Sequence, residues 1–309
     1  EPLRRGYPVT VPILTNSGSG HPFSADRCGW PVLPHRVAEV RDWAATHRGR
    51  GSLLLRHLDR RSGAQCVPQS ARLVFTTRCP VLESTGDGWV PPVSKNLAKN
   101  LLRFRRRLQA MGVSFAWIPP EEMTPDAVDL LFALHASSRS LRGGSSFTPE
   151  LHAGFHRRLV ASGRPGCGPA MAIASHEGRP IGISYGFVWR DTYYEYQGGW
   201  DISYANLRVG KVLSGETIRL AQLQGLRALD YLRGTESYKY SWGATDVVDE
   251  TWLLPRGVSG WLLGQKFRVA RAEQARDARR AERGHPRTRE RRHSNADASR
   301  DAETRRRLP

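Results

Sequence analysis

The segment 192–242 constrains the fold of this chain more than any other. Its first residues are rich in tyrosine and favour a β-strand up to Gly198, and the pair Gly198-Gly199 marks a break or bulge. Apolar residues at steps of three and four then predict a helix that ends at Gly225, a residue type favoured at helix ends: Val209, Val212, Leu213, Thr217, Leu220, Ala221 and Leu223. A second strand is predicted at 228–232. A strand, a crossover helix and another strand require parallel strands, so the sequence predicts a βαβ-type unit.

The start of this predicted helix is a candidate anion site. A helix N-terminus presents free backbone N–H groups and the positive end of the helix dipole. Gly210 would let a bulky anion approach the backbone, and Arg208 and Lys211 add positive charge. These features suit a pyrophosphate. The alternative is an ordinary turn with surface cations, because a single glycine is a weak phosphate signal.

Two segments of this unit resemble the CelD/BioF-like acetyltransferase domain of the GNAT superfamily, which is related to the FemAB transferases. Residues 208–213 (RVGKVL) match its degenerate S-P-G-x-x-L loop, while Leu207 and Val212 depart from the general GNAT loop Q/R-x-x-G-x-G/A. Residues 230–243 (DYLRGTESYKYSWG) match its pattern D-F-x-x-G-x-E-x-Y-K-x-x-W/F-G. The resemblance covers about residues 94–267. It implies an α/β (α+β) GNAT fold with a mixed, mostly antiparallel central sheet flanked by helices.

The same resemblance implies direct attack of an amine on the thioester of acetyl-CoA or another acyl-CoA. In the family, two splayed strands admit the thioester and strand N–H groups hold its carbonyl; here these strands would be residues 192–198 and 228–232. The loop that begins the helix would bind coenzyme A through five residues: Arg208, Val209, Gly210, Lys211 and Val212.

Four residues are candidates for the proton transfers that this chemistry needs. Glu195 and Glu236 are candidate general bases, and Tyr238 is the candidate acid for the leaving thiolate. Lys239 would orient an anionic acceptor or stabilise developing charge. Burial within the aromatic strand would raise the pKa of Glu195 toward neutrality. The structural alternatives are an outward-facing strand charge for Glu195 and a packing turn onto Trp242 for Tyr238 and Lys239.

The chain divides into three predicted parts. Residues 1–93 would form a partial N-terminal GNAT-like region that ends near Pro91-Pro92. Residues 94–267 would form the acyltransferase domain, and residues 268–309 the end of a charged helix and a disordered, arginine-rich tail, because apolar residues are scarce after position 283. Periodicity and propensity predict helices at 34–47, 94–110, 124–141, 147–160 and 258–283, and strands at 52–58, 71–76, 113–118, 170–174, 181–189 and 247–254.

A net charge of +18 favours anionic partners in general. The predicted helix 94–110 has a basic face, so this helix and the tail would be the parts that bind a nucleic acid; a solvated helix face is the alternative. Four scattered cysteines and histidines without a second ligand at suitable spacing indicate no metal site. Without an apolar run of ~18 residues or a signal-peptide pattern, we expect a soluble, cytoplasmic protein.

The leading hypothesis is a GNAT N-acyltransferase that moves an acyl group from acyl-CoA to an amine. Its acceptor would be an amino sugar or another cell-envelope or polysaccharide precursor. One alternative is a Fem-like aminoacyl-tRNA-dependent transferase, in which the basic helix and tail bind RNA. The other is a non-catalytic module that binds an anionic polymer through the tail. Motifs for a nucleophilic serine or cysteine and for nucleotide hydrolysis are missing from the sequence.

Overall fold

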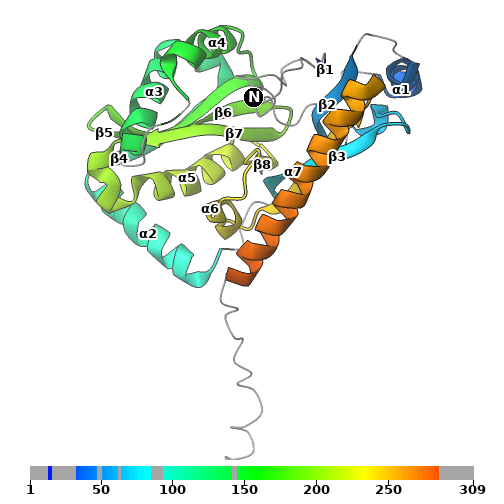
Figure 1. Ribbon diagram of the computed structural model, residues 1–309. Helices are drawn as coiled ribbons and strands as arrows, with labels where there is room; N and C mark the ends of the chain where they lie inside the picture. Colours follow the sequence, from blue (N-terminus) through cyan, green and yellow to red (C-terminus); the bar gives the residue numbers. More distant parts are fainter. Residues whose placement is uncertain are drawn as a thin grey trace, which may run out of the picture. The chain divides into compact units, whose positions relative to one another are not determined.

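The computed structural model describes residues 13–15, 33–46, 51–61, 64–84, 93–140, 145 and 147–284. The chain forms two compact units, Glu1–Trp261 and Leu262–Pro309. The first unit contains a nine-stranded sheet with the strand order β1-β2-β9-β3-β8-β7-β6-β5-β4 (Figure 1). Two of its strand pairs, β1 with β2 and β7 with β8, are parallel and the others are antiparallel. This confirms the predicted mixed, mostly antiparallel sheet.

An antiparallel run of four strands makes up one end of the sheet. Its members are β4 (Val113–Ile118), β5 (Cys167–His176), β6 (Arg179–Trp189) and β7 (Thr192–Trp200). The turn between β5 and β6 places Glu177 and Gly178 at φ values of 50° and 76°. Glycine adopts such values without a steric penalty, which makes the tight connection feasible. The strands predicted at 170–174, 181–189 and 192–198 are therefore confirmed, and they pair antiparallel in sequence.

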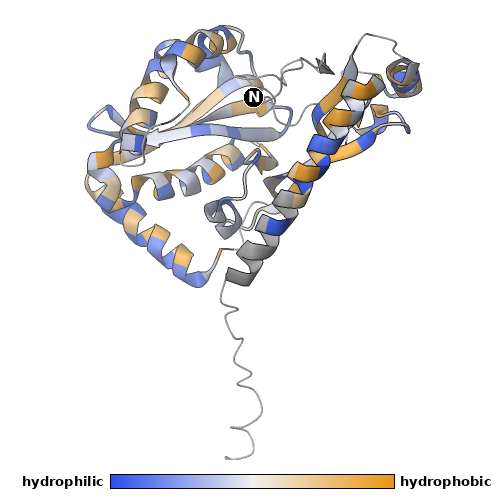
Figure 2. Ribbon diagram, in the orientation of Figure 1, coloured by the Kyte–Doolittle hydropathy of each residue, from blue (hydrophilic) through white to orange (hydrophobic). Residues whose placement is uncertain are grey.

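Helices cover both faces of this part of the sheet (Figure 1). One face carries α3 (Asp126–Arg139) and α4 (Pro149–Ala161), and the other carries α2 (Lys95–Ala110) and α5 (Val209–Leu223). Ser94 caps α2 through a hydrogen bond that its side chain accepts from Leu97 N. Along α2, hydrophobic and hydrophilic residues alternate in bands, as an amphipathic helix requires (Figure 2).

The period of two along the strands builds a separate core on each face. Met171, Ile183 and Tyr185 pack with residues of α3 and α4. Ala172 and Ala174, which alternate with Met171 along β5, pack with α2 and α5, and so does Ile181, the extra residue of a bulge in β6. The sheet is thus fixed from both sides, and the strand ends between the helices can carry a site.

The predicted βαβ unit is confirmed, with α5 between β7 and the parallel strand β8 (Ala228–Asp230). Pairing is short and joins Thr192, Tyr193 and Tyr194 to the three residues of β8. β8 ends two residues earlier than predicted, because Leu232 has a φ of 54° that an extended strand does not allow. β7 continues to Trp200, so the two strands separate after Tyr194.

Two connections of this unit contain short helices. The residues before α5 form a 3₁₀ helix, η5 (Ile202–Leu207), whose first turn is held by the Asp201 carboxylate accepting from Ser203 N at 3.0 Å. The segment after β8 contains a short helix, α6 (Ser237–Ser241). Both connections lie next to the point where β7 and β8 separate, and they shape the candidate site described below.

The N-terminal strands belong to the same sheet. β2 (Ser52–Asp59) and β3 (Arg72–Glu83) both pair with β9 (Thr245–Leu254), and β3 also pairs with β8. The remaining elements of this region are β1 (Ile13–Thr15), η1 (Pro34–Arg36), α1 (Val37–Thr46) and η2 (Ala64–Cys66), while η3 (Pro120–Glu122) follows β4. The division into parts 1–93, 94–267 and 268–309 stays a prediction, and Pro91-Pro92 lies outside the described residues.

The last described element is α7 (Gly257–Gly284), which agrees with the helix predicted at 258–283 and continues into the second unit. The tail after residue 284 lies outside the described residues. Within the part of the chain that the structure describes, none of the helices combines the length and the apolar character needed to cross a membrane.

Candidate active site

A cavity of about 600 Å³ lies where β7 and β8 separate. Its walls come from β6, β7, the start of α5, the segment after β8 and α6, and the end of α3. β7 carries a bulge at this point: Tyr185 faces Gln197 and Gly186 faces Glu195, so Tyr196 is the extra residue between them. A bulge disrupts the ladder locally and re-aims the side chains beside it, and such bulges are frequent next to active sites.

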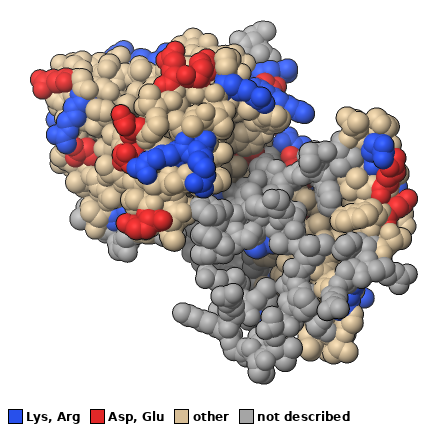
Figure 3. All heavy atoms as spheres, turned by 90° about the horizontal axis from the view of Figure 1, so that it is seen from above, with Lys and Arg blue, Asp and Glu red and all other residues tan. Residues whose placement is uncertain are grey.

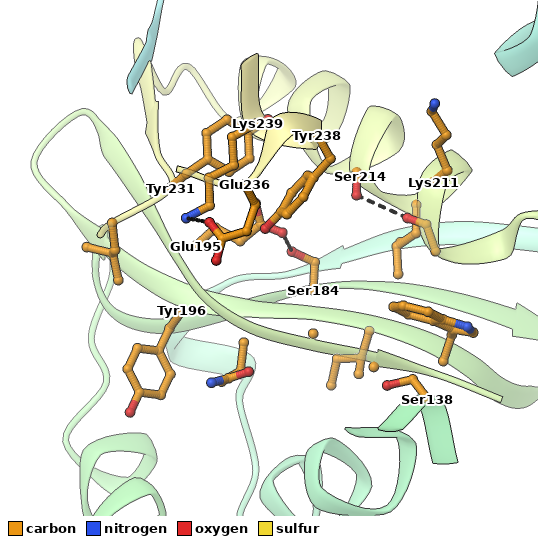
Figure 4. Close-up of a pocket in the computed structure, with 18 of the residues that line it drawn as sticks. Ser138, Ser184, Glu195, Tyr196, Lys211, Ser214, Tyr231, Glu236, Tyr238 and Lys239 are labelled. Atoms are coloured by element: carbon orange, nitrogen blue, oxygen red, sulfur yellow. Dashed lines mark hydrogen bonds and ion pairs between the residues drawn. The ribbon is translucent and has the colours of Figure 1, made fainter. Parts of the chain in front are cut away.

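Glu195 lies in this cavity, half-buried, and is not the outward-facing charge of the alternative interpretation (Figure 4). Ser184 on β6 donates a hydrogen bond to its Oε1 at 3.2 Å. Burial raises the pKa of Glu195 to about 7, against the opposing effects of the Ser184 hydrogen bond and the Lys239 charge. A carboxyl with this pKa exists in both protonation states near neutral pH and is suited to accept a proton from an amine.

Glu236 and Lys239 form an ion pair at the cavity wall, with 2.9 Å between Oε2 and Nζ. The buried Lys239 ammonium also donates to the carbonyl oxygens of Arg233 at 2.9 Å and Gly234 at 3.4 Å. Burial raises the pKa of Glu236, but its hydrogen bonds, the Lys239 bond foremost, bring it below the ordinary value. The contacts of Lys239 therefore favour a role in holding the loop after β8.

The backbone of the loop after β8 packs closely against the ion pair of Glu236 and Lys239. Gly234 has a φ of 116°, and a Cβ at this residue would lie 2.4 Å from the Glu236 carboxylate. The Asp230 carboxylate accepts from Leu232 N at 2.8 Å and fixes the turn that leaves β8. The Asp, Gly, Glu and Lys positions of the sequence pattern thus shape one loop.

Two tyrosines face the interior of the site. Tyr238, the candidate acid, is 48% exposed, while Tyr231 is only 3% exposed, and their rings meet edge to face at 6.2 Å between centroids. Burial and the Glu195 charge raise the pKa of both phenols. Among the described residues, no group forms a hydrogen bond with the Tyr231 hydroxyl. Both tyrosines therefore remain protonated near neutral pH and can act as donors.

The predicted coenzyme A loop is spread over three environments. Gly210 and Lys211 line the cavity at the start of α5, and Val209 is buried in the core. Arg208, at the N-cap with a φ of 55°, and Val212 border a separate hollow beside α2, which Lys211 also reaches. The structure therefore brings only part of this loop to the cavity.

The reason expected for Gly210 needs correction. A Cβ at this position would lie 2.8 Å from Cε3 of Trp200. The space left by the missing side chain is occupied by this indole and does not admit a bulky anion. Glycine is required here so that α5 can approach the end of β7.

The side of β7 opposite Glu195 faces α3, as Figure 4 shows for Tyr196 and Ser138. Arg139, Phe147 and His152 complete this half of the cavity. The histidines of α3 and α4 are packed between these helices and the sheet: His135, for instance, lies 3.0 Å from both Gly198 O and Ser145 Oγ. The described residues contain no group of three or more His, Cys, Asp or Glu side chains arranged to hold a metal ion.

Comparison with known families adds the decisive observation. Residues 95–240 match the acetyltransferase (GNAT) domain family. The protein carries a GNAT domain. The match spans the strands β4 to β8, α5 and the loop with Glu236. It thus includes every residue that lines the cavity except Ser241, the last residue of α6, and its cap Trp242. A GNAT domain supports the assignment of the chain as a transferase.

Solved structures share the fold over about three quarters of this chain. The C-terminal domain (DUF2156) of an Agrobacterium fabrum protein assigned as lysylphosphatidylglycerol synthetase has a TM-score of 0.53 and 10% identity, and the match covers 74% of this chain and 76% of that chain. L-PGS from Bacillus licheniformis has a TM-score of 0.51 and 10% identity, covering 72% and 74%. FemX has a TM-score of 0.53 and 7% identity, and the match covers 81% of this chain and 81% of that chain. None of the curated proteins matches the sequence.

Several residues of the GNAT domain site escaped the reasoning from sequence. Ser184 has no motif that marks it, and Arg139 lies at the end of a helix far from the recognised segments. Tyr231 did carry a signal, because the pattern that residues 230–243 resemble has phenylalanine at this position. The hydroxyl of Tyr231 is therefore a point at which this chain departs from that pattern.

Proposed function

We propose that the protein is an N-acyltransferase that moves an acyl group from acyl-CoA to an amine. The observation that carries this proposal is the opening between β7 and β8, with Glu195 inside it and a bulge on β7 beside it. In such a reaction the amine nitrogen forms a bond to the carbonyl carbon and the carbon–sulfur bond breaks. The site needs a proton acceptor, donors for the carbonyl oxygen and a proton for the thiolate.

The described residues supply candidates for each of these tasks. Glu195, with its raised pKa, would take the proton of the attacking amine. Backbone N–H groups of β7 would hold the thioester carbonyl, and Tyr238 would give its proton to the thiolate. Glu236 and Lys239 would act through the loop that they hold rather than on the substrate.

The donor would lie along the start of α5. Lys211 is exposed and borders the main cavity and both smaller hollows between α2, α5 and α6, so its ammonium can reach a pyrophosphate in any of them. Free N–H groups and the dipole of α5 would add to this attraction. Arg103 and Asn100 of α2 line the hollow beside α2 that Arg208 and Val212 border, and they would contact the nucleotide end of the donor.

The acceptor would enter from the α3 side. Phe147 and Tyr196 present aromatic surface there, with rings 5.9 Å apart, and Ser138, Arg139 and His152 present polar groups. Aromatic and polar groups together suit an amino sugar or a related cell-envelope precursor. On the outer face of α3 and α4, basic and acidic side chains are interspersed (Figure 3), and Arg157 pairs with Asp129. This face is therefore a weak candidate for binding a polyanion.

A second candidate is transfer from an aminoacyl-tRNA. It is favoured by the shared fold with FemX and with a protein assigned as lysylphosphatidylglycerol synthetase. The basic residues of α2 would then contact RNA, and the cavity would hold the aminoacyl end. The two candidates differ in the donor and share the same site.

Calorimetry with acetyl-CoA and longer acyl-CoAs tests the choice of donor. We expect micromolar binding, about 8 kcal/mol, and a loss of at least about tenfold in Lys211→Glu, because one attractive charge becomes repulsive. Arg158→Glu is the matched control, since Arg158 is exposed on α4 and lines none of the three hollows. Gly210→Glu would instead displace Trp200 and report on folding.

The outcomes separate the candidates. Binding of no acyl-CoA by the wild-type chain would overturn the proposal and direct the search to aminoacyl-tRNA. Salt-dependent nucleic-acid binding that disappears when residues 284–309 are deleted, together with no donor binding, would instead favour a non-catalytic module. Equal losses in Lys211→Glu and Arg158→Glu would show that only the net charge matters.

A further inference from the structure

The hydroxyl of Tyr231 is an unusual feature of the site. The side chain is 3% exposed and lies directly after β8, at the point where β7 and β8 separate. Its oxygen is buried and has no hydrogen-bond partner among the described residues, although the residue lines the cavity. A buried hydroxyl without a partner destabilises a fold, so its retention calls for an explanation.

Other buried tyrosines of the sheet show how such groups are normally satisfied. Tyr193 donates to the carbonyl oxygen of Ser184 at 3.0 Å. The Tyr185 hydroxyl lies 3.0 Å from Nδ1 of His156. Tyr231 has no equivalent contact, and the pattern that this segment resembles has phenylalanine at its position. A phenylalanine would fill the same space without the unpartnered oxygen.

The chemistry of the hydroxyl indicates what would bind it. Burial, the Glu195 charge and Tyr238 raise the pKa of Tyr231, so the phenol keeps its proton and acts as a donor. Glu195 is close enough to influence this pKa and accepts a hydrogen bond from Ser184 instead. A neutral donor beside a carboxylate base provides two complementary functions: one binds an oxygen and the other takes a proton.

We propose that the Tyr231 hydroxyl donates a hydrogen bond to the carbonyl oxygen of the acyl group. This inference rests on the acyl-CoA function proposed above. During transfer the amine nitrogen bonds to the carbonyl carbon, and the carbonyl electrons move to the oxygen, where Tyr231 stabilises the negative charge and keeps its own proton. Glu195 takes the amine proton. The carbon–sulfur bond then breaks, and the thiolate receives a proton from Tyr238.

The test compares Tyr231→Phe with the wild-type chain on two ligands that differ in one oxygen. Acetyl-CoA has the carbonyl, and S-ethyl-coenzyme A lacks it. We expect the variant to bind acetyl-CoA about three- to tenfold more weakly, the range of one hydrogen bond, and to bind S-ethyl-coenzyme A as the wild type does. Release of free thiol from acetyl-CoA, with water as acceptor, should fall by about 100-fold.

A measurement of stability keeps a structural role distinguishable. Because the variant loses a hydroxyl without a partner, its Tm should equal or exceed that of the wild type. Tyr204→Phe is the matched control: Tyr204 lines none of the three hollows, and its hydroxyl lies 2.7 Å from Nδ1 of His176. This variant should bind both ligands as the wild type does and release thiol at the same rate.

Each other outcome has a definite meaning. If Tyr231→Phe binds and cleaves acetyl-CoA like the wild type, the inference is overturned while the acyl-CoA function stands. Equal weakening of both ligands would also overturn it, since the oxygen would then not contact the carbonyl. If the wild-type chain binds neither ligand, the acyl-CoA function is wrong and the role of Tyr231 is wrong with it.

Discussion

Replacing Glu195 by glutamine should make the protein more stable and less active. The carboxyl has an ordinary pKa of 4.5 and a pKa of about 7 in the folded chain, chiefly because of burial. Stability contributed by a group with a raised pKa is present below 4.5, declines as the pH rises toward 7 and is constant above it. The difference corresponds to about 3 kcal/mol at 1.36 kcal/mol per pKa unit. Glutamine never ionises and avoids this cost.

Denaturant unfolding at two pH values measures the effect. At pH 8.5 the free energy of unfolding of Glu195→Gln should exceed that of the wild type by up to about 3 kcal/mol, and at pH 5 by less than about 1 kcal/mol. Glu121→Gln is the control, because Glu121 is exposed in η3 and lies outside the cavity. This control should match the wild type at both pH values.

The rate of thiol release from acetyl-CoA should fall in Glu195→Gln, whereas the stability rises. In the wild type the rate should fall about tenfold from its plateau to pH 6, because only the ionised form of a group with a pKa of about 7 accepts a proton. In Glu195→Gln the rate of thiol release should be lower by at least about 100-fold, and it should no longer depend on pH in this way. A stability gain that is the same at pH 5 and pH 8.5, or an unchanged pH–rate profile, would refute the reasoning.

Three further substitutions test the frame of the site. Gly199→Ala should cost about 1–3 kcal/mol of unfolding free energy, because its Cβ would lie 2.3 Å from the backbone nitrogen of His135; Gly178→Ala, with no atom near its Cβ and a φ of 76°, separates crowding from backbone strain. Lys239→Met should cost about 1–3 kcal/mol by leaving two carbonyl oxygens unpaired, and a melting curve unaltered by it would contradict the loop-holding role. His57→Leu should remove a loss of stability between pH 6.5 and about 4, since burial lowers the pKa of this imidazole, which forms no hydrogen bond with a described residue, to about 4; acid titration of unfolding checks it.

Local patterns predicted the local parts of the fold. The spacing of Val209, Val212 and Leu220 is enough to place α5, because a helix buries one face whatever surrounds it. The pairing of β2 with β9 joins Leu53 to Leu254, two residues about 200 positions apart. No periodicity within either strand encodes such a partner, so the extension of the sheet by the N-terminal strands could not be derived. The early end of β8 has the same origin, since the positive φ of Leu232 arises from the loop beyond it.

The orientation of Glu195 was open for a different reason. In a regular strand, side chains alternate, so Tyr196 and Trp200 would face the same side. The bulge at Tyr196 changes this alternation: Tyr196 packs with the core on the α3 side and Trp200 with the core on the α5 side. The sequence shows the glycine pair Gly198-Gly199 near this point, but it does not show which residue forms the bulge. Only the structure could assign Glu195 to the cavity.

The same cavity contains two groups that cost stability when it holds no ligand. Glu195 must ionise in a half-buried place, and the Tyr231 hydroxyl has no partner among the described residues. Structural roles do not account for either, since glutamine and phenylalanine would fill the same space at lower cost. An acceptor amine would give Glu195 a positively charged partner, and an acyl carbonyl would give Tyr231 an acceptor. Both costs would then be offset by the two halves of a single reaction, which supports the proposed acyl transfer over a purely structural role for these groups.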